Sequence, residues 1–201
     1  MDKEISNLEE YDLKVEFLKM LKPTKTTIFF VLPLFLLTLY GAIFLTENIY
    51  QTISLIGIGI FISLASIQDF NEKMVFEILL YPTAFFSLLF LKTEDIDRTF
   101  TFVSGVIENI IVGSFLVFSI WFLSYILSII LKKETLGTGD FPIFFLFIIL
   151  LKIHTPIGLI VMALSAIIYK IIKKEEEIPL IPFLYFGLIT TFIYFQTIGQ
   201  N

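Results

Sequence analysis

The sequence predicts an all-α protein, a polytopic transmembrane helix bundle with six to seven spanning helices. Of its 201 residues, 57% are hydrophobic and 16% are charged. Soluble domains of this size are about 45–50% apolar and about 25% charged. The mean hydropathy is +0.90, and long apolar segments alternate with short polar ones along the whole chain. These observations indicate a membrane protein that has little mass outside the bilayer.

A membrane-spanning helix needs about 20 mostly apolar residues. Seven segments meet or approach this requirement, at about 26–46, 50–69, 74–92, 102–131, 139–153, 156–172 and 178–198. The first contains Pro33, which a membrane helix tolerates because its neighbours can satisfy the freed carbonyl. Residues 1–25 are polar and of mixed charge, without the apolar core of a signal peptide. They predict a cytoplasmic N-terminal tail with a short amphipathic helix.

The distribution of Lys and Arg predicts the orientation. With a cytoplasmic N-terminus and alternating spans, the inner segments hold Lys3, Lys14, Lys19, Lys22, Lys25, Lys73, Lys132, Lys133, Lys170, Lys173 and Lys174. The outer segments hold only Lys92, Arg98 and Lys152. We therefore expect a multi-pass protein of the cell membrane with its N-terminus in the cytoplasm.

Two aspartates stand at the edges of apolar segments. Asp69 ends the second predicted span, and Asp140 begins the fifth within the sequence Gly137-Thr138-Gly139-Asp140. The orientation puts both carboxylates at the cytoplasmic face. Taken singly, Asp69 fits a helix end facing water, and Asp140 fits an N-cap. A simple cap does not need two preceding glycines, which instead permit close backbone approach. Ionisable residues in membrane helices are candidate functional sites.

A third element, Ile178–Phe183 (I-P-L-I-P-F), opens the last predicted span. Two prolines three residues apart cannot both lie inside a regular helix without loss of backbone hydrogen bonds. We expect an interrupted helix start there, on the same side of the membrane. Prolines that simply mark a helix start are the plainer interpretation.

In this order, the three elements resemble the type IV prepilin peptidases, which are G-x-G-D intramembrane aspartic proteases and include archaeal preflagellin (archaellin) peptidases. The resemblance covers 50–198, so 26–49 would be an additional N-terminal transmembrane helix. It implies that Asp69 and Asp140 are the catalytic pair. It also implies that motif or backbone support comes from Gly137, Gly139, Pro179, Pro182 and Phe183.

The resemblance implies the substrates as well: pilin-like or archaellin precursors, whose short basic leader would be removed at the cytoplasmic face. Bacterial members usually carry a Cys-rich domain, and this chain has no Cys. They also commonly show I-P-N after the first aspartate, where Met74-Val75-Phe76-Glu77 stands here. The chain therefore looks more like the short archaeal relatives, and the resemblance gives no basis for a methyltransferase activity.

A pair of close carboxylates titrates as a unit and retains one proton. The ionised group would activate water, and the protonated group would donate to the scissile carbonyl oxygen. Helix dipoles favour negative charge at a helix N-terminus and disfavour it at a C-terminus. This predicts that Asp140 is the ionised base and Asp69 the protonated acid. With no Cys and one His, we expect no metal site and no cofactor.

Three other interpretations make different predictions. A transporter or proton relay would place carboxylates near mid-membrane or on both sides of the membrane, and it would show inverted repeats. The presenilin and signal peptide peptidase branch also uses G-x-G-D, but with Tyr-Asp and Pro-Ala-Leu where this chain has Gln68-Asp69 and no Pro-Ala-Leu. A structural membrane component would have no chemistry. No basic cluster indicates nucleic-acid binding, and the expected partners are the bilayer and precursor substrates. The oligomeric state stays open.

Overall fold

The computed structural model describes residues 19–73, 75, 77–94, 154–174 and 178–199, with single residues or pairs at 111, 114–115, 118–119, 121–122, 125–126, 129, 144 and 150–151. Five helices have defined bounds here: α2 (Lys25–Phe44), α3 (Ile49–Glu72), α4 (Glu77–Glu94), α7 (Thr155–Lys173) and α8 (Leu180–Gly199). The described residues contain no strand. For this part of the chain, the predicted all-α class is confirmed.

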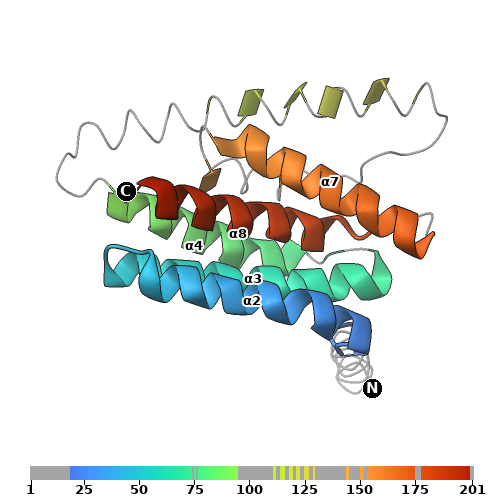
Figure 1. Ribbon diagram of the computed structural model, residues 1–201, viewed down its shortest axis with the longest axis horizontal. Coiled ribbons are helices and arrows are strands. Elements are labelled where there is room, and N and C mark those ends of the chain that lie inside the picture. Colours follow the sequence, from blue (N-terminus) through green and yellow to red (C-terminus); the bar gives the residue numbers. More distant parts are fainter. Residues whose placement is uncertain are drawn as a thin grey trace, which may run out of the picture.

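The helices run roughly along one common direction (Figure 1). α3 is the central element, because it packs against α2, α4 and α8, while α7 packs against α8. In the apolar window of α3, 61% of residues are buried, against 17% for α7. At one end of the bundle, α2 and α8 begin and α3 and α7 finish, so these four helix ends meet there.

Four helices are long and apolar enough to cross a membrane: α2, α3, α7 and α8. Within the described part of α4, the apolar stretch is shorter, Ile78–Phe90. The predicted spans 102–131 and 139–153 lie almost wholly outside the described residues. By length and composition, the described residues thus contain four candidate spans, and the expected total of six to seven is not confirmed.

Local sequence explains where α2 and α3 begin. Thr24 precedes α2, and its Oγ1 accepts from the Thr27 N–H at 3.2 Å, while the Thr24 N–H donates back to Thr27 Oγ1 at 2.6 Å. At α3, Asn48 Oδ1 accepts from the Gln51 N–H at 2.9 Å. Such side chains satisfy backbone N–H groups that have no partner within a helix. Polar residues between apolar runs therefore set these boundaries.

The second span was expected to finish at Asp69, but α3 continues to Glu72. It ends at Lys73, which has a left-handed conformation (φ 55°) and donates its N–H to the carbonyl of Asp69. α7 ends in the same way at Lys174 (φ 56°), which donates to the carbonyl of Lys170. Asp69 consequently lies within the last turn of α3 and not at its terminus.

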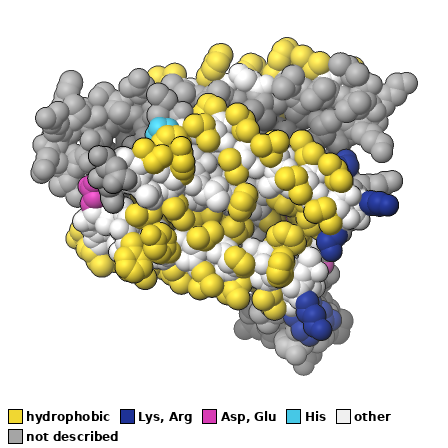
Figure 2. All heavy atoms as spheres, in the orientation of Figure 1, with side chains coloured by type: hydrophobic (Ala, Val, Ile, Leu, Met, Phe, Trp, Pro, Cys, Tyr) yellow, Lys and Arg dark blue, Asp and Glu magenta, His cyan; other side chains and the backbone are white. Residues whose placement is uncertain are grey.

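The surface is largely apolar over the sides of the bundle and basic at one end. Large side chains such as Phe29 and Ile171 are 75% and 70% exposed, as expected for helices that face lipid. Figure 2 shows the Lys side chains of the described residues gathered at one end of the molecule. We call this the lysine-rich end, defined by Lys22, Lys25, Lys170, Lys173 and Lys174. Both Asp69 and the start of α8 lie toward it.

The main core joins α3, α4 and α8. Its buried members include Ala65, Leu79, Ile181 and Leu184, together with Phe144 from the segment before α7. α7 and α8 approach so closely that a Cβ on Gly187 would lie 2.5 Å from the carbonyl oxygen of Gly158. Small residues permit this kind of close helix packing in membranes, so the α7–α8 crossing depends on that glycine.

Candidate functional site

Asp69 is a buried carboxylate at the lysine-rich end, with only 6% of its surface exposed. Its Oδ2 accepts a hydrogen bond from the backbone N–H of Ile181 at 2.8 Å. Ile181 is the second residue of α8, and N–H groups in a first helical turn have no acceptor within their own helix. Asp69 of α3 therefore caps the N-terminus of α8 from a separate helix.

This bond brings the first and third sequence elements together. Pro179 comes directly before α8, and Pro182 is its third residue. Neither position requires an N–H for the helical ladder, so both prolines fit without loss of a backbone bond. Pro179 and Phe183 are both buried. The sequence predicts an interrupted helix start here. In the structure, α8 begins between the two prolines.

Four aromatic rings surround this end of the bundle, one each from α2, α3, α7 and α8. The centroid of Tyr169 lies 5.2 Å from that of Phe183, 5.7 Å from that of Phe30 and 6.2 Å from that of Phe70. We call these four residues the aromatic cluster. Because Phe70 follows Asp69 and Phe183 belongs to the proline motif, the cluster holds both sequence elements in place. Such offset and edge-on ring arrangements are favourable.

The sequence did not single out Phe30, Phe70 or Tyr169. Phe is abundant, with 24 in the chain, and an apolar ring in a membrane helix suits either lipid or the protein interior. Of these three, only Phe70 could have been identified from the sequence, because it is next to Asp69. The tertiary arrangement decides which rings meet.

Asn71, in the last turn of α3, holds the segment that precedes α2. Its amide donates to the carbonyl of Met20 at 2.7 Å and to that of Lys22 at 3.1 Å, and Leu21 packs against the main core. Residues 19–22 belong to the predicted cytoplasmic N-terminal tail, 1–25. The structure attaches this last part of the predicted tail to the helix that carries Asp69.

The second predicted aspartate, Asp140, lies outside the described residues, as do Gly137 and Gly139. The nearest described residue is Phe144, four positions later, which is only 3% exposed. It belongs to the same buried core as Ala65 and Ile181. Ala65 lies one helical turn before Asp69, so the chain after the G-x-G-D sequence enters the core that adjoins Asp69.

Asp69 lies near two helix ends of opposite polarity. The C-terminus of α3 disfavours negative charge, while the N-terminus of α8 favours it. The expectation that Asp69 carries the shared proton used the dipole of α3 alone. The N-terminus of α8 favours the ionised form of Asp69 and so opposes the effect of α3. The two dipoles together do not favour the protonated form of Asp69 over that of Asp140.

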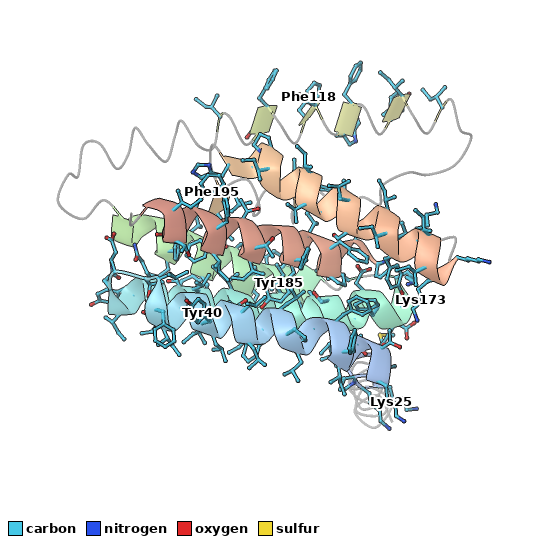
Figure 3. All side chains as sticks on the ribbon, in the orientation of Figure 1. Lys25, Tyr40, Phe118, Lys173, Tyr185 and Phe195 are labelled. Atoms are coloured by element: carbon cyan, nitrogen blue, oxygen red, sulfur yellow. The ribbon has the colours of Figure 1, made fainter. Side chains whose placement is uncertain are left out.

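The remaining surroundings are sparse in other reactive groups. Within the described ranges, no group of three or more His, Asp or Glu residues could hold a metal ion. His154 lies at the opposite end, where its ring stacks on Phe195 with a centroid distance of 3.6 Å. Figure 3 shows Phe195 far from Lys173 along the bundle.

Comparison with known proteins gives no relative: no family model, no curated protein and no solved structure matches the chain.

Proposed function

We propose that this protein is a membrane-embedded aspartic endopeptidase of the type IV prepilin peptidase kind, which removes the short basic leader from pilin-like or archaellin precursors. The observation that carries the proposal is the 2.8 Å hydrogen bond between Asp69 and the Ile181 N–H. It joins the first and third elements of the motif set, which are 112 residues apart, at one end of the bundle.

A purely structural role explains this arrangement less well. Helix capping needs only an acceptor oxygen, and Ser, Thr or Asn supplies one without charge. A carboxylate inside a membrane helix costs free energy and usually serves function. Asp69 is both buried and bonded to the backbone at the start of α8. These features suit a reacting group more than a cap alone.

The second carboxylate of the proposed pair is Asp140, which the span 139–153 would carry. Phe144 lies four residues beyond it in the sequence and is buried in the core that includes Ala65 and Ile181, which supports an approach of Asp140 to Asp69. Gly137 and Gly139 would leave space for the substrate backbone. The full complement of six to seven spans, with 102–131 and 139–153 among them, forms part of this proposal.

In the proposed reaction, the two aspartates share one proton. The ionised carboxylate takes a proton from water as the water oxygen attacks the scissile carbonyl carbon. The protonated carboxyl donates its proton to the carbonyl oxygen, and collapse of the tetrahedral intermediate releases the new amine after proton transfer. The amide bond is hydrolysed without a covalent enzyme intermediate.

The proposal sets the lysine-rich end in the cytoplasm, following the positive-inside rule. The precursor leader would stay on that side while its apolar helix lies in the membrane. Glu72, which is exposed one turn after Asp69, could then attract a basic leader. α2 would be the additional helix relative to the family pattern.

The test is cleavage of a tagged pilin-like precursor by membranes that carry Asp69→Asn, Asp140→Asn or the wild-type chain. Asn keeps an oxygen that can accept from the Ile181 N–H, but it cannot act as a carboxyl acid or base. We expect each variant to lose at least about 100-fold in rate, in line with general acid–base contributions. The control is Glu47→Gln, which removes an exposed carboxylate between α2 and α3 at the opposite end of the bundle, and its rate should stay within about twofold of the wild type.

Cleavage that survives either Asn substitution, in chains inserted as well as the wild type, would refute the two-aspartate peptidase. A transporter would instead show proton or ion flux in proteoliposomes that Asp69→Asn abolishes while no precursor is shortened.

A further inference from the structure

A long groove of about 870 Å³ runs along the outside of the bundle between α2 and α7. Its walls are the first half of α2 and the second half of α7, and its floor is the first turns of α8. Both wall helices pack against α8. Three members of the aromatic cluster line it: Phe30, Tyr169 and Phe183. The groove therefore lies in the half of the bundle that contains Asp69.

The groove is open sideways, toward the position that lipid would occupy. Residues along its rims are strongly exposed, among them Phe29 at 75%, Ile168 at 57% and Ile172 at 70%. Apart from the lysines, only Ser165 and Tyr169 among the lining residues have a polar side-chain atom, and the Ser165 hydroxyl already donates to the Met162 carbonyl at 2.8 Å. A ligand in the groove would therefore meet an almost wholly apolar wall.

Two lysines line the groove, one from each wall and both from the lysine-rich end. Lys25 is the first residue of α2, and Lys173 is the last residue of α7. Figure 3 shows both at the same end of the bundle. Both are exposed, and neither ammonium group has an ion pair or hydrogen bond within the described residues. The groove is thus apolar along its length and cationic at one end.

We propose that this groove binds one anionic phospholipid, with the phosphate between Lys25 and Lys173 and the acyl chains along the apolar walls. Basic pockets between membrane helices are suited to anionic headgroups. Lysine side chains beside apolar surface can place their ammonium groups at headgroup level. The inference rests on the membrane character of the helices, and only the exclusion of a precursor segment as occupant refers to the proposed peptidase function.

An apolar segment of a precursor protein is a less suitable occupant of a groove with these two charges. A precursor of the proposed class would carry a basic leader at this end of its helix, where the two lysines would repel it. An anionic lipid has the complementary charge at the required end. The additional helix α2 then acquires a role, since it supplies one wall and one of the two lysines.

The experiment measures lipid bound to the full chain by native mass spectrometry from detergent, with phosphatidylglycerol and phosphatidylcholine of identical acyl chains. Each lysine near an anionic headgroup contributes about fivefold in affinity. We expect the wild type to prefer phosphatidylglycerol by at least about tenfold, and the double variant Lys25→Gln/Lys173→Gln to lose that preference.

The matched control is Lys22→Gln/Lys174→Gln, which removes the same charge from the same end at residues that do not line the groove. It should keep most of the preference. Ser165→Trp, which fills the groove, should weaken binding of both lipids. Circular dichroism and gel-filtration profiles identical to the wild type establish that each variant is folded.

The proposal fails if the wild type binds both lipids equally, or if the control pair loses as much preference as the groove pair. The latter result would show general surface attraction at the lysine-rich end. Displacement of bound phosphatidylglycerol by Ser165→Trp but not by Lys25→Gln/Lys173→Gln would also refute it, because an apolar occupant, such as a transmembrane peptide, would then suffice.

Discussion

Oδ2 of Asp69 lies 2.8 Å from the backbone nitrogen of Ile181, and the bond between them is buried. It connects the last turn of α3 with the first turn of α8. Loss of an acceptor leaves a buried N–H group without a partner, which costs about 1–3 kcal/mol. The same carboxylate is thus a fold-stabilising group and the first candidate for chemistry, and substitutions can separate these two roles.

Asp69→Ala should lower the free energy of unfolding by about 1–3 kcal/mol, because it removes the acceptor for the Ile181 N–H. Asp69→Asn should recover most of that loss, since its amide oxygen can accept the same bond. Equilibrium unfolding in mixed micelles, followed by circular dichroism, gives both values. Equal stability of the Ala and Asn variants would show that the bond contributes nothing to the fold.

Gly187→Ala should destabilise the protein by about 1–3 kcal/mol, the usual cost of inserting an extra group into a packed interface. The new Cβ would lie 2.5 Å from the Gly158 carbonyl oxygen, so backbone would have to move. Gly41→Ala is the matched control in α2, because its Cβ would first meet a Phe192 ring atom at 3.4 Å. Thermal unfolding in detergent should separate the two variants, and a tolerated Gly187→Ala would contradict the tight α7–α8 crossing.

The buried hydroxyl pair of Thr38 and Tyr185, with an oxygen–oxygen distance of 2.6 Å, should couple α2 to α8. Thr38→Val, Tyr185→Phe and the double variant form a cycle. We expect a coupling free energy of about 0.6 kcal/mol, the average for hydrogen bonds between membrane helices. Strictly additive losses in the free energy of unfolding would mean that the two side chains do not support one another.

Much of the helical architecture was predictable from apolar length and polar punctuation. The first predicted span, 26–46, appears as α2 (Lys25–Phe44), and 156–172 appears as α7 (Thr155–Lys173). Prediction worked here because a run of about 20 apolar residues has few alternatives in a membrane. The predicted end of α3 was less accurate, because the segment Gln68–Glu72, which is polar except for Phe70, resembles a helix end. In the fold, Gln68 and Asp69 of that run are buried, so the helix can continue.

The sequence by itself determined the membrane class, the basic bias of one end and the two motif elements around Asp69 and Pro179–Phe183. These properties reside in composition, periodicity and short local patterns. Only the tertiary structure decided that Asp69 caps α8, that four aromatic rings meet beside it, and that α2 and α7 leave a groove between them. The physical reason is that an apolar membrane helix suits lipid and protein equally well on any face. Its partners are chosen by close packing and by a few buried polar bonds between segments far apart in the chain.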